Sequence, residues 1–250
     1  MKLRIAKPAF VIDIDPLAEA LGYIDVHTDH VRVGAMTRHR ALLESTALPA
    51  IFADAERVIA DPVVRNRGTI GGALCQADPS EDLSAVCAAV KARLVIRGAA
   101  GERVVTMEEF HVGPYETAVG PAEILVEIRV PRGLGSAYAK VDRRVGDWAV
   151  VAAGAALRLH DGVIAEAGIA LAAVGGELTA REAEASLLGR EPGAEAFAHA
   201  ARLAAEACEP VTDQRGSAEY KRHVAAVLTE RVLDRAAKEN LKGTVPLADV

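Results

Sequence analysis

The sequence predicts an α+β protein made of two domains that follow each other along the chain. Three observations predict this class. Strand and helix patterns alternate over the first 130 residues, a strand meander covers 138–174, and three alanine-rich helical stretches come last. A chain of 250 residues is long enough for two domains with buried cores. We assign residues 1–134 to the first domain, 135–241 to the second and 242–250 to a tail.

The first domain is expected to begin with strands and short helices. A strand at Phe10–Ile14 is followed by a break at Asp15-Pro16, and Tyr23–Val33 is typical of a hairpin with its turn at residues 27–30. Thr37 opens a helix that ends before Pro49. The remaining elements expected here are helices over 51–60 and 79–90 and strands over 94–96, 103–105 and 124–130.

The second domain is expected to be an antiparallel sheet followed by helices. Its strands cover 138–141, 149–159 and 163–174, with a turn at Asp161-Gly162. The helices cover 180–188, 194–206 and 217–240.

Composition excludes several classes of protein. Hydrophobic residues make up 51% and charged residues 26% of the chain, which is typical of a globular protein. The net charge of −6 gives no reason to bind nucleic acid. The longest apolar run, Trp148–Leu157, is too short to span a bilayer. Three scattered cysteines and the lack of a signal peptide pattern favour a cytoplasmic location.

The segment from Thr69 to Asp82 is the most informative for function. Thr69-Ile70-Gly71-Gly72-Ala73 places two glycines after a short extended segment, where backbone N–H groups could face a diphosphate. Without further context, a tight strand-to-helix connection explains the same residues. Downstream, Asp78 can serve as the N-cap of a helix, with Pro79 at its first position and Glu81 completing a capping box. This leaves the Asp82 carboxylate free to accept hydrogen bonds from sugar hydroxyls.

Three ordered segments together resemble a known family. Arg65–Gly72 with Ala77-Asp78-Pro79 and Asp82 is similar to the second flavin-binding motif of the medium subunits of molybdenum hydroxylases. Glu123–Pro131 resembles the strand that leads out of their flavin domain, and Lys140–Ala149 resembles the opening of their C-terminal domain. The resemblance covers nearly the whole chain. It implies a vanillyl-alcohol-oxidase-type FAD-binding domain followed by a smaller α+β domain.

The resemblance also implies which residues meet FAD. At the diphosphate we expect the stretch Thr69, Ile70, Gly71, Gly72 and Ala73. Asp82 is expected at the sugar chain, and Asp78 belongs to the same cofactor-binding set. Leu125 and Lys140 are expected near the isoalloxazine ring, as is Ile59. A lysine suits this place because a cation stabilises reduced flavin, although a solvated strand lysine is the alternative for Lys140. No catalytic residue and no metal ligand is expected on this chain.

The sequence departs from the family pattern in two ways. The family usually has asparagine where this chain has Ala73. An earlier Gly-Gly-rich loop is not found, and Met1–Ile14 is similar to the segment that follows that loop. We therefore expect a truncated flavin domain with a half-built diphosphate site.

The favoured function is an FAD-binding electron-transfer subunit. The resemblance implies a large subunit with the molybdenum cofactor and a small subunit with iron–sulfur clusters, arranged as a dimer of heterotrimers, with NAD, quinone or oxygen as the acceptor. Two alternatives stay open: a structural subunit that has lost FAD, and a free-standing flavin oxidase. His27, Asp29 and His30 are interpreted as a solvated turn, and His39 as a surface residue.

Overall fold

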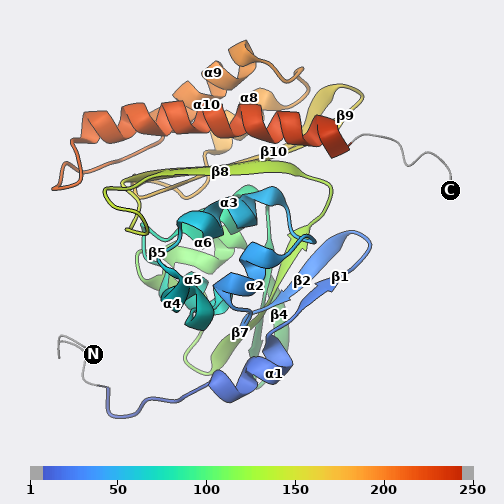
Figure 1. Ribbon diagram of the computed structural model, residues 1–250, viewed down its shortest axis with the longest axis vertical. Helices are drawn as coiled ribbons and strands as arrows, with labels where there is room; N and C mark the ends of the chain where they lie inside the picture. The colour runs from blue at the N-terminus through green and yellow to red at the C-terminus, as the bar shows by residue number, and fades with distance from the viewer. Residues whose placement is uncertain (1–7, 244–250) are drawn as a thin grey trace.

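The computed structural model describes the backbone of residues 8–243 and side chains as far as residue 240. It confirms the α+β class, with two larger antiparallel sheets and helices packed between and around them (Figure 1). Most of the predicted tail, residues 244–250, and the first seven residues lie outside the described part.

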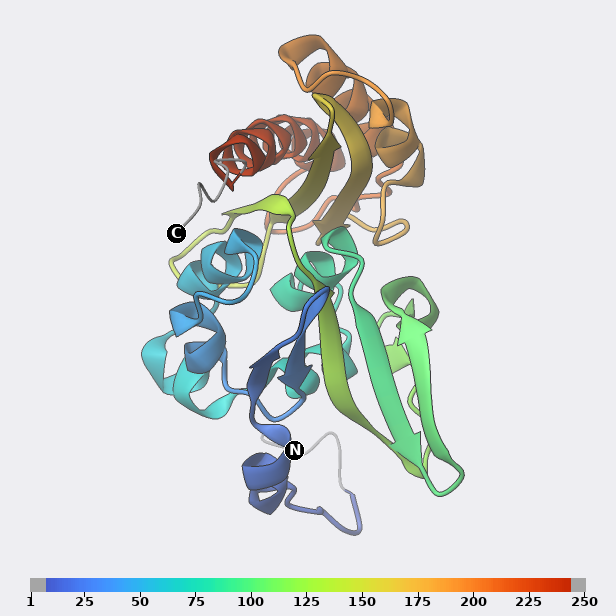
Figure 2. The ribbon, with the colours of Figure 1, turned by 90° about the vertical axis from the view of Figure 1, so that its right-hand side faces the viewer.

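The first sheet has five strands in the order β1-β2-β7-β3-β4, and all neighbours are antiparallel. Its strands are β1 (Ile24–Val26), β2 (His30–Gly34), β3 (Arg93–Gly98), β4 (Gly101–Thr106) and β7 (Glu123–Pro131). The predicted hairpin and the β-branched strand before Pro131 are confirmed. A separate two-stranded ribbon pairs β5 (His111–Gly113) with β6 (Glu116–Thr117) and contacts α7 and α5. Figure 2 shows the long hairpin of β3 and β4 on one side of this sheet.

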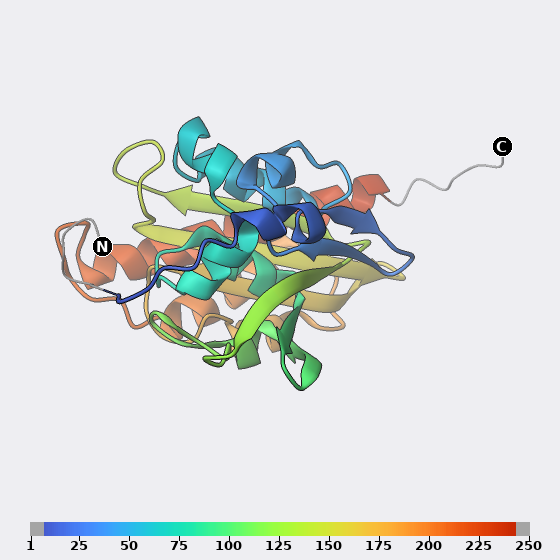
Figure 3. The same cartoon turned by 90° about the horizontal axis from the view of Figure 1, so that it is seen from below.

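Short helices make up the rest of the first domain. They are a 3-10 turn at Asp15–Leu17, α1 (Ala18–Leu21), α2 (His39–Glu44), α3 (Ala50–Val58), α4 (Pro62–Arg67), α5 (Ile70–Gln76), α6 (Asp82–Ala89) and α7 (Met107–Phe110). In the view from below, α1 and the β1–β2 hairpin face the reader (Figure 3).

Two predicted elements of the first domain are wrong. Phe10–Ile14 forms no strand, and its apolar side chains at 10, 11 and 12 are exposed. The extended segment expected before the glycines is helix α4, because Asp61 caps the Val64 amide and Pro62 occupies the first helical turn. The glycines themselves lie inside the first turn of α5 rather than in a loop.

The second sheet is layered between helices. Its strands β8 (Gly135–Val141), β9 (Val151–His160) and β10 (Val163–Ala172) have the order β10-β9-β8. One face carries α8 (Arg181–Leu187), α9 (Ala194–Glu206) and α10 (Ala218–Gly243), while α3 and α6 cover the other face (Figure 1). The sequence explains this packing, because α9 buries Ala196, Ala200 and Ala204, which are spaced one helical turn apart.

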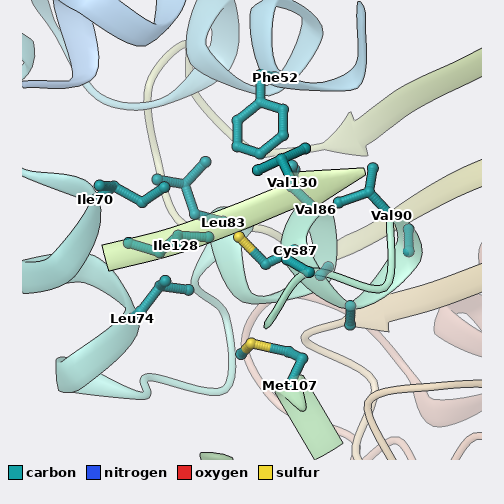
Figure 4. Packing of buried hydrophobic residues seen from close by; sticks show 14 of the residues in the cluster. Phe52, Ile70, Leu74, Leu83, Val86, Cys87, Val90, Met107, Ile128 and Val130 are labelled. Carbon is teal, nitrogen blue, oxygen red and sulfur yellow. The ribbon is translucent and has the colours of Figure 1, made fainter. Parts of the chain in front are cut away.

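Helix α6 joins the two halves of the molecule. All eight of its residues are buried, as expected for a helix that is apolar on most sides. Leu83, Val86 and Cys87 of this helix pack with Phe52 of α3 and Ile128 of β7 in one core (Figure 4). Helix α6 also packs closely on the second sheet, since a Cβ at Gly168 of β10 would lie 1.9 Å from the Ala89 carbonyl oxygen.

Candidate functional site

The first turn of α5 carries the glycine pair. Thr69 is the N-cap residue, and its hydroxyl oxygen accepts from the Gly72 amide at 3.1 Å. All four amides of the turn donate within the protein: Ile70 to the Thr37 carbonyl, Gly71 to the Ala35 carbonyl, Gly72 to the Thr69 hydroxyl and Ala73 to the Thr69 carbonyl. The expectation of outward-facing, free amides is therefore wrong. The Thr69 hydroxyl hydrogen still has no acceptor among the described residues.

The two glycines serve different purposes. A Cβ at Gly71 would lie 2.7 Å from both the Cβ and the carbonyl oxygen of Ala35, so only glycine fits where α5 meets that backbone. A Cβ at Gly72 would meet only the Thr69 hydroxyl, at 3.0 Å, and Gly72 is exposed. The open face of this turn is therefore at Gly72.

Asp82 and Lys140 meet as a buried ion pair. The Lys140 Nζ donates to Asp82 Oδ2 at 3.0 Å and to the Asp147 carbonyl at 3.1 Å, and the Lys140 side chain is only 1% exposed. The Tyr138 hydroxyl donates to the other Asp82 oxygen at 2.5 Å. Burial raises the pKa of Asp82, while the charge of Lys140 and the Tyr138 hydrogen bond lower it. The expectation that Asp82 has no structural role is wrong, because it links α6 to β8.

The N-terminus of α6 differs from the predicted capping box. Glu81, not Asp78, is the N-cap, and its carboxylate accepts from the amides of Leu83 and Ser84 at 2.6 and 2.7 Å. Burial raises the pKa of Glu81 to about 7. Asp78 instead accepts from the Ser80 amide and from the Tyr115 hydroxyl.

The other residues of the expected cofactor set are only partly accessible. Ile70 and Leu125 are core residues, with 0% and 3% exposure. Ile59 is half-buried, and its carbonyl accepts from Arg65 Nη1 at 2.6 Å. Ala73 is half-buried against the same core. Their role beside a flavin stays a prediction.

A cleft of about 1000 Å³ opens beside the N-terminus of α6. Its lining includes Asp78, Glu81, His111, Gly175, Thr179 and Arg181. Asp78 is the one residue of the expected cofactor set that lines it. The cleft is therefore built mainly from β5, the segment between β10 and α8, and α8, and no residue of the glycine turn lines it.

A buried histidine–glutamate pair was not predicted. His39 Nδ1 lies 2.9 Å from Glu56 Oε1, and the two side chains are 7% and 0% exposed. The interpretation of His39 as a surface residue is thus wrong. The sequence carried a signal, because Glu56 follows the spacing of Ile51, Phe52 and Ala55 on the buried face of α3. The backbone amide of His39 also donates to the Gly68 carbonyl, one residue before Thr69.

The described residues contain neither a metal-binding cluster nor a membrane-spanning helix. In the His27–His30 turn, the two imidazole rings stack at 5.1 Å and His30 pairs with the exposed Asp29. Within the described residues, no three His, Cys, Asp or Glu side chains form a group that could hold a metal ion. No described helix is long and apolar enough to cross a bilayer.

Known proteins share both the sequence and the fold of this chain. Residues 1–133 match the family "FAD binding domain in molybdopterin dehydrogenase", and residues 136–236 match the "CO dehydrogenase flavoprotein C-terminal domain". The carbon monoxide dehydrogenase medium chain of Hydrogenophaga pseudoflava is 40% identical over 94% of this chain and 84% of its own.

Solved structures agree with the sequence matches. Carbon monoxide dehydrogenase from Hydrogenophaga pseudoflava, lacking the Mo-pyranopterin moiety, superposes with a TM-score of 0.90 at 41% identity, over 96% of this chain and 85% of that one. Quinoline 2-oxidoreductase from Pseudomonas putida 86 gives a TM-score of 0.86 at 32% identity, over 96% of this chain and 86% of that one. The chain therefore belongs to the family of FAD-binding medium subunits of molybdenum hydroxylases, a family whose cofactor is FAD, and is an oxidoreductase subunit.

Proposed function

We propose that this chain is the electron-relay subunit of a molybdenum hydroxylase complex and binds FAD beside the first turn of α5 and the Asp82–Lys140 pair. The observation that carries the proposal is that pair. The family resemblance implies that both residues lie near the flavin, although they belong to separate segments. The two side chains are in contact although they are 58 residues apart in the sequence. Bound FAD would supply the ability to take up electrons from one centre and pass them to another.

The residues present fit such a cofactor. The open face at Gly72 admits close approach of a phosphate group, and the Thr69 hydroxyl has a hydrogen to donate. Each Asp82 oxygen accepts one hydrogen bond from the described residues, and a carboxylate oxygen has a further lone pair with which to accept from a sugar hydroxyl. Lys140, whose side chain is 1% exposed, donates two of its three N–H hydrogens, to Asp82 and to the Asp147 carbonyl. Its charge would favour reduced flavin.

The names of similar chains support a proposal for the partner subunits of this chain. Similar chains are named medium chains or medium subunits of carbon monoxide dehydrogenase and of nicotine 6-hydroxylase. We propose that a large subunit with the molybdenum cofactor and a small iron–sulfur subunit join this chain in a dimer of heterotrimers in the cytoplasm. Substrate oxidation would take place on the large subunit, and this chain would hand the electrons to an external acceptor.

Co-purification of the complex tests the proposal. The chain is expressed together with a large and a small subunit of a molybdenum hydroxylase, and flavin is quantified by absorbance before and after substrate is added. We expect bound FAD that is bleached by substrate. Lys140→Gln should lower FAD content, whereas Lys91→Gln should not, because Lys91 pairs with Glu184 on the surface. A complex without flavin, or a flavin that substrate leaves oxidised, would refute the electron-relay role.

A second candidate function is a structural subunit that does not hold flavin. The observation in its favour is that all four amides from Ile70 to Ala73 already donate within the protein. A diphosphate would have to be held without them or displace their acceptors. Gel filtration of the purified chain decides between the two, because a flavin spectrum that stays with the polypeptide rejects the structural role.

A further inference from the structure

Tyr138 is the second donor to the Asp82 carboxylate, beside Lys140. Its side chain is buried, with 2% of the residue exposed, and its hydroxyl donates to Asp82 Oδ1 at 2.5 Å. Lys140 binds the other oxygen, Oδ2, at 3.0 Å. Residues 138 and 140 share one face of β8 because side chains alternate along a strand. The carboxylate is therefore held from both sides by a single strand.

The backbone of Tyr138 is fixed independently of its side chain. The Tyr138 amide donates to Asp54 Oδ2 of α3 at 3.2 Å, and its carbonyl accepts from Arg235 Nη1 of α10 at 2.9 Å. Arg235 and Asp54 are themselves paired at 2.6 Å. Helices from both domains therefore hold the backbone from which the Tyr138 hydroxyl reaches Asp82.

The charges around Asp82 make this hydrogen bond important. Lys140 faces it from β8, Asp142 acts on it from the segment after β8, and Glu81 precedes it on the same helix turn. Glu56 of α3, paired with His39, also interacts with Asp82. Burial and the charge of Asp142 raise the pKa of Asp82, whereas the donors Lys140 and Tyr138 favour its charged form.

We propose that Tyr138 is a positioning residue that fixes the orientation of Asp82 and keeps it as the charged partner of Lys140. The extension of this role to the flavin rests on the proposed function. Without the hydroxyl, Asp82 would take up a proton at higher pH. Once Asp82 is neutral, the charge of Lys140 is no longer balanced, and a nearby reduced flavin would be stabilised.

Titration of Asp82 in the full chain tests the proposal directly. Selectively labelled aspartate carboxyl carbons are followed by NMR from acid to neutral pH, and Asp82→Asn assigns the resonance. In Tyr138→Phe, which keeps the ring, the Asp82 midpoint should rise by about one pH unit or more, since hydrogen bonds to charged groups are strong. Replacing tyrosine by 3-fluorotyrosine, a more acidic donor, should lower the midpoint while preserving the packing.

Tyr23→Phe is the matched control. Tyr23 also donates to a buried carboxylate, Glu127 Oε2 at 2.8 Å, but does so on the five-stranded sheet. It should leave the Asp82 midpoint unchanged. An unchanged midpoint in Tyr138→Phe, or an equal shift in the control, would overturn the role of Tyr138.

The flavin extension has its own measurement. The midpoint potential of FAD in the assembled complex is recorded against pH, and the pH at which its slope changes should move upward in Tyr138→Phe. A shifted Asp82 titration with an unmoved potential overturns the extension alone. A wild-type complex without FAD refutes the proposed function, while the NMR titration of the chain still decides the role of Tyr138.

Discussion

Gly71→Ala and Gly72→Ala should separate a glycine needed for packing from a glycine that leaves a surface open. At Gly71 the new Cβ would lie 2.7 Å from both the Ala35 Cβ and the Ala35 carbonyl oxygen and 3.2 Å from its carbonyl carbon. Favourable carbon contacts are about 3.5–4.0 Å. None of these three atoms can rotate away, so α5 must shift and lengthen the Gly71–Ala35 hydrogen bond, which is 2.8 Å.

The expected cost of Gly71→Ala is that of an overpacked core, roughly 1–3 kcal/mol. For a protein of this size that corresponds to a fall in Tm of roughly 2–12 °C. Gly72→Ala should be nearly neutral or slightly stabilising, because alanine favours helix by about 0.5–1 kcal/mol over glycine and its Cβ meets only the Thr69 hydroxyl.

Thermal and urea unfolding of both variants measure the difference, and FAD content of the complex is measured in parallel. Gly72→Ala should reduce FAD content with little change in Tm, since its methyl group fills the open face. Equal stability of Gly71→Ala and the wild type would refute the packing argument. Loss of Tm in Gly72→Ala would show that its face is not open.

Three further outcomes are expected. Lys140→Met leaves Asp82 buried without its charge partner and should lower the free energy of unfolding in urea by about 3–5 kcal/mol. Lys238→Met, in an exposed pair, should change that free energy by less than about 1 kcal/mol. Equal effects of the two substitutions would contradict the reasoning from burial. Burial raises the pKa of Glu81 from 4.5 to about 7, so the folded state holds an extra proton and stability should fall as pH rises through this window. Glu81→Gln should flatten that part of a pH series of unfolding curves, and an unaltered slope would assign it elsewhere. His39→Ala removes the partner of the buried Glu56 and should lower the free energy of unfolding by about 1–3 kcal/mol, measured by chemical denaturation. His160→Ala, at an exposed site, is the control. Equal stability of the two variants would rule the pair out as a stabilising contact.

Much of the fold could be predicted because its signals are local. The strand over 124–130 is β-branched and ends at a proline, and the structure has it at Glu123–Pro131. The turn at Asp161-Gly162 joins β9 and β10 as expected. Phe10–Ile14 has the same apolar character as a strand but no neighbour to pair with among the described residues, and a strand is defined by its partner.

The site was less accessible to sequence reasoning because its contacts are distant. Asp78 is of a type favoured at the N-cap and Glu81 is not, yet Glu81 is the N-cap, and Asp78 instead binds Tyr115, which is 37 residues away. The resemblance named Asp82 and Lys140 separately, but no local pattern indicated that they pair. Tyr138 was missed for the same reason, since its position two residues before Lys140 matters only once β8 faces α6.

The close packing of α6 against both halves of the molecule limits how the halves can move. At Gly168 the backbones of this helix and the second sheet are in close contact, and the opposite side of the helix packs in the core of the first domain. A hinge between the halves would have to unpack that core, so large-scale opening is too costly to serve as a gate. Under the proposed electron-relay function, a donor or acceptor would have to reach the cofactor without separation of the two halves.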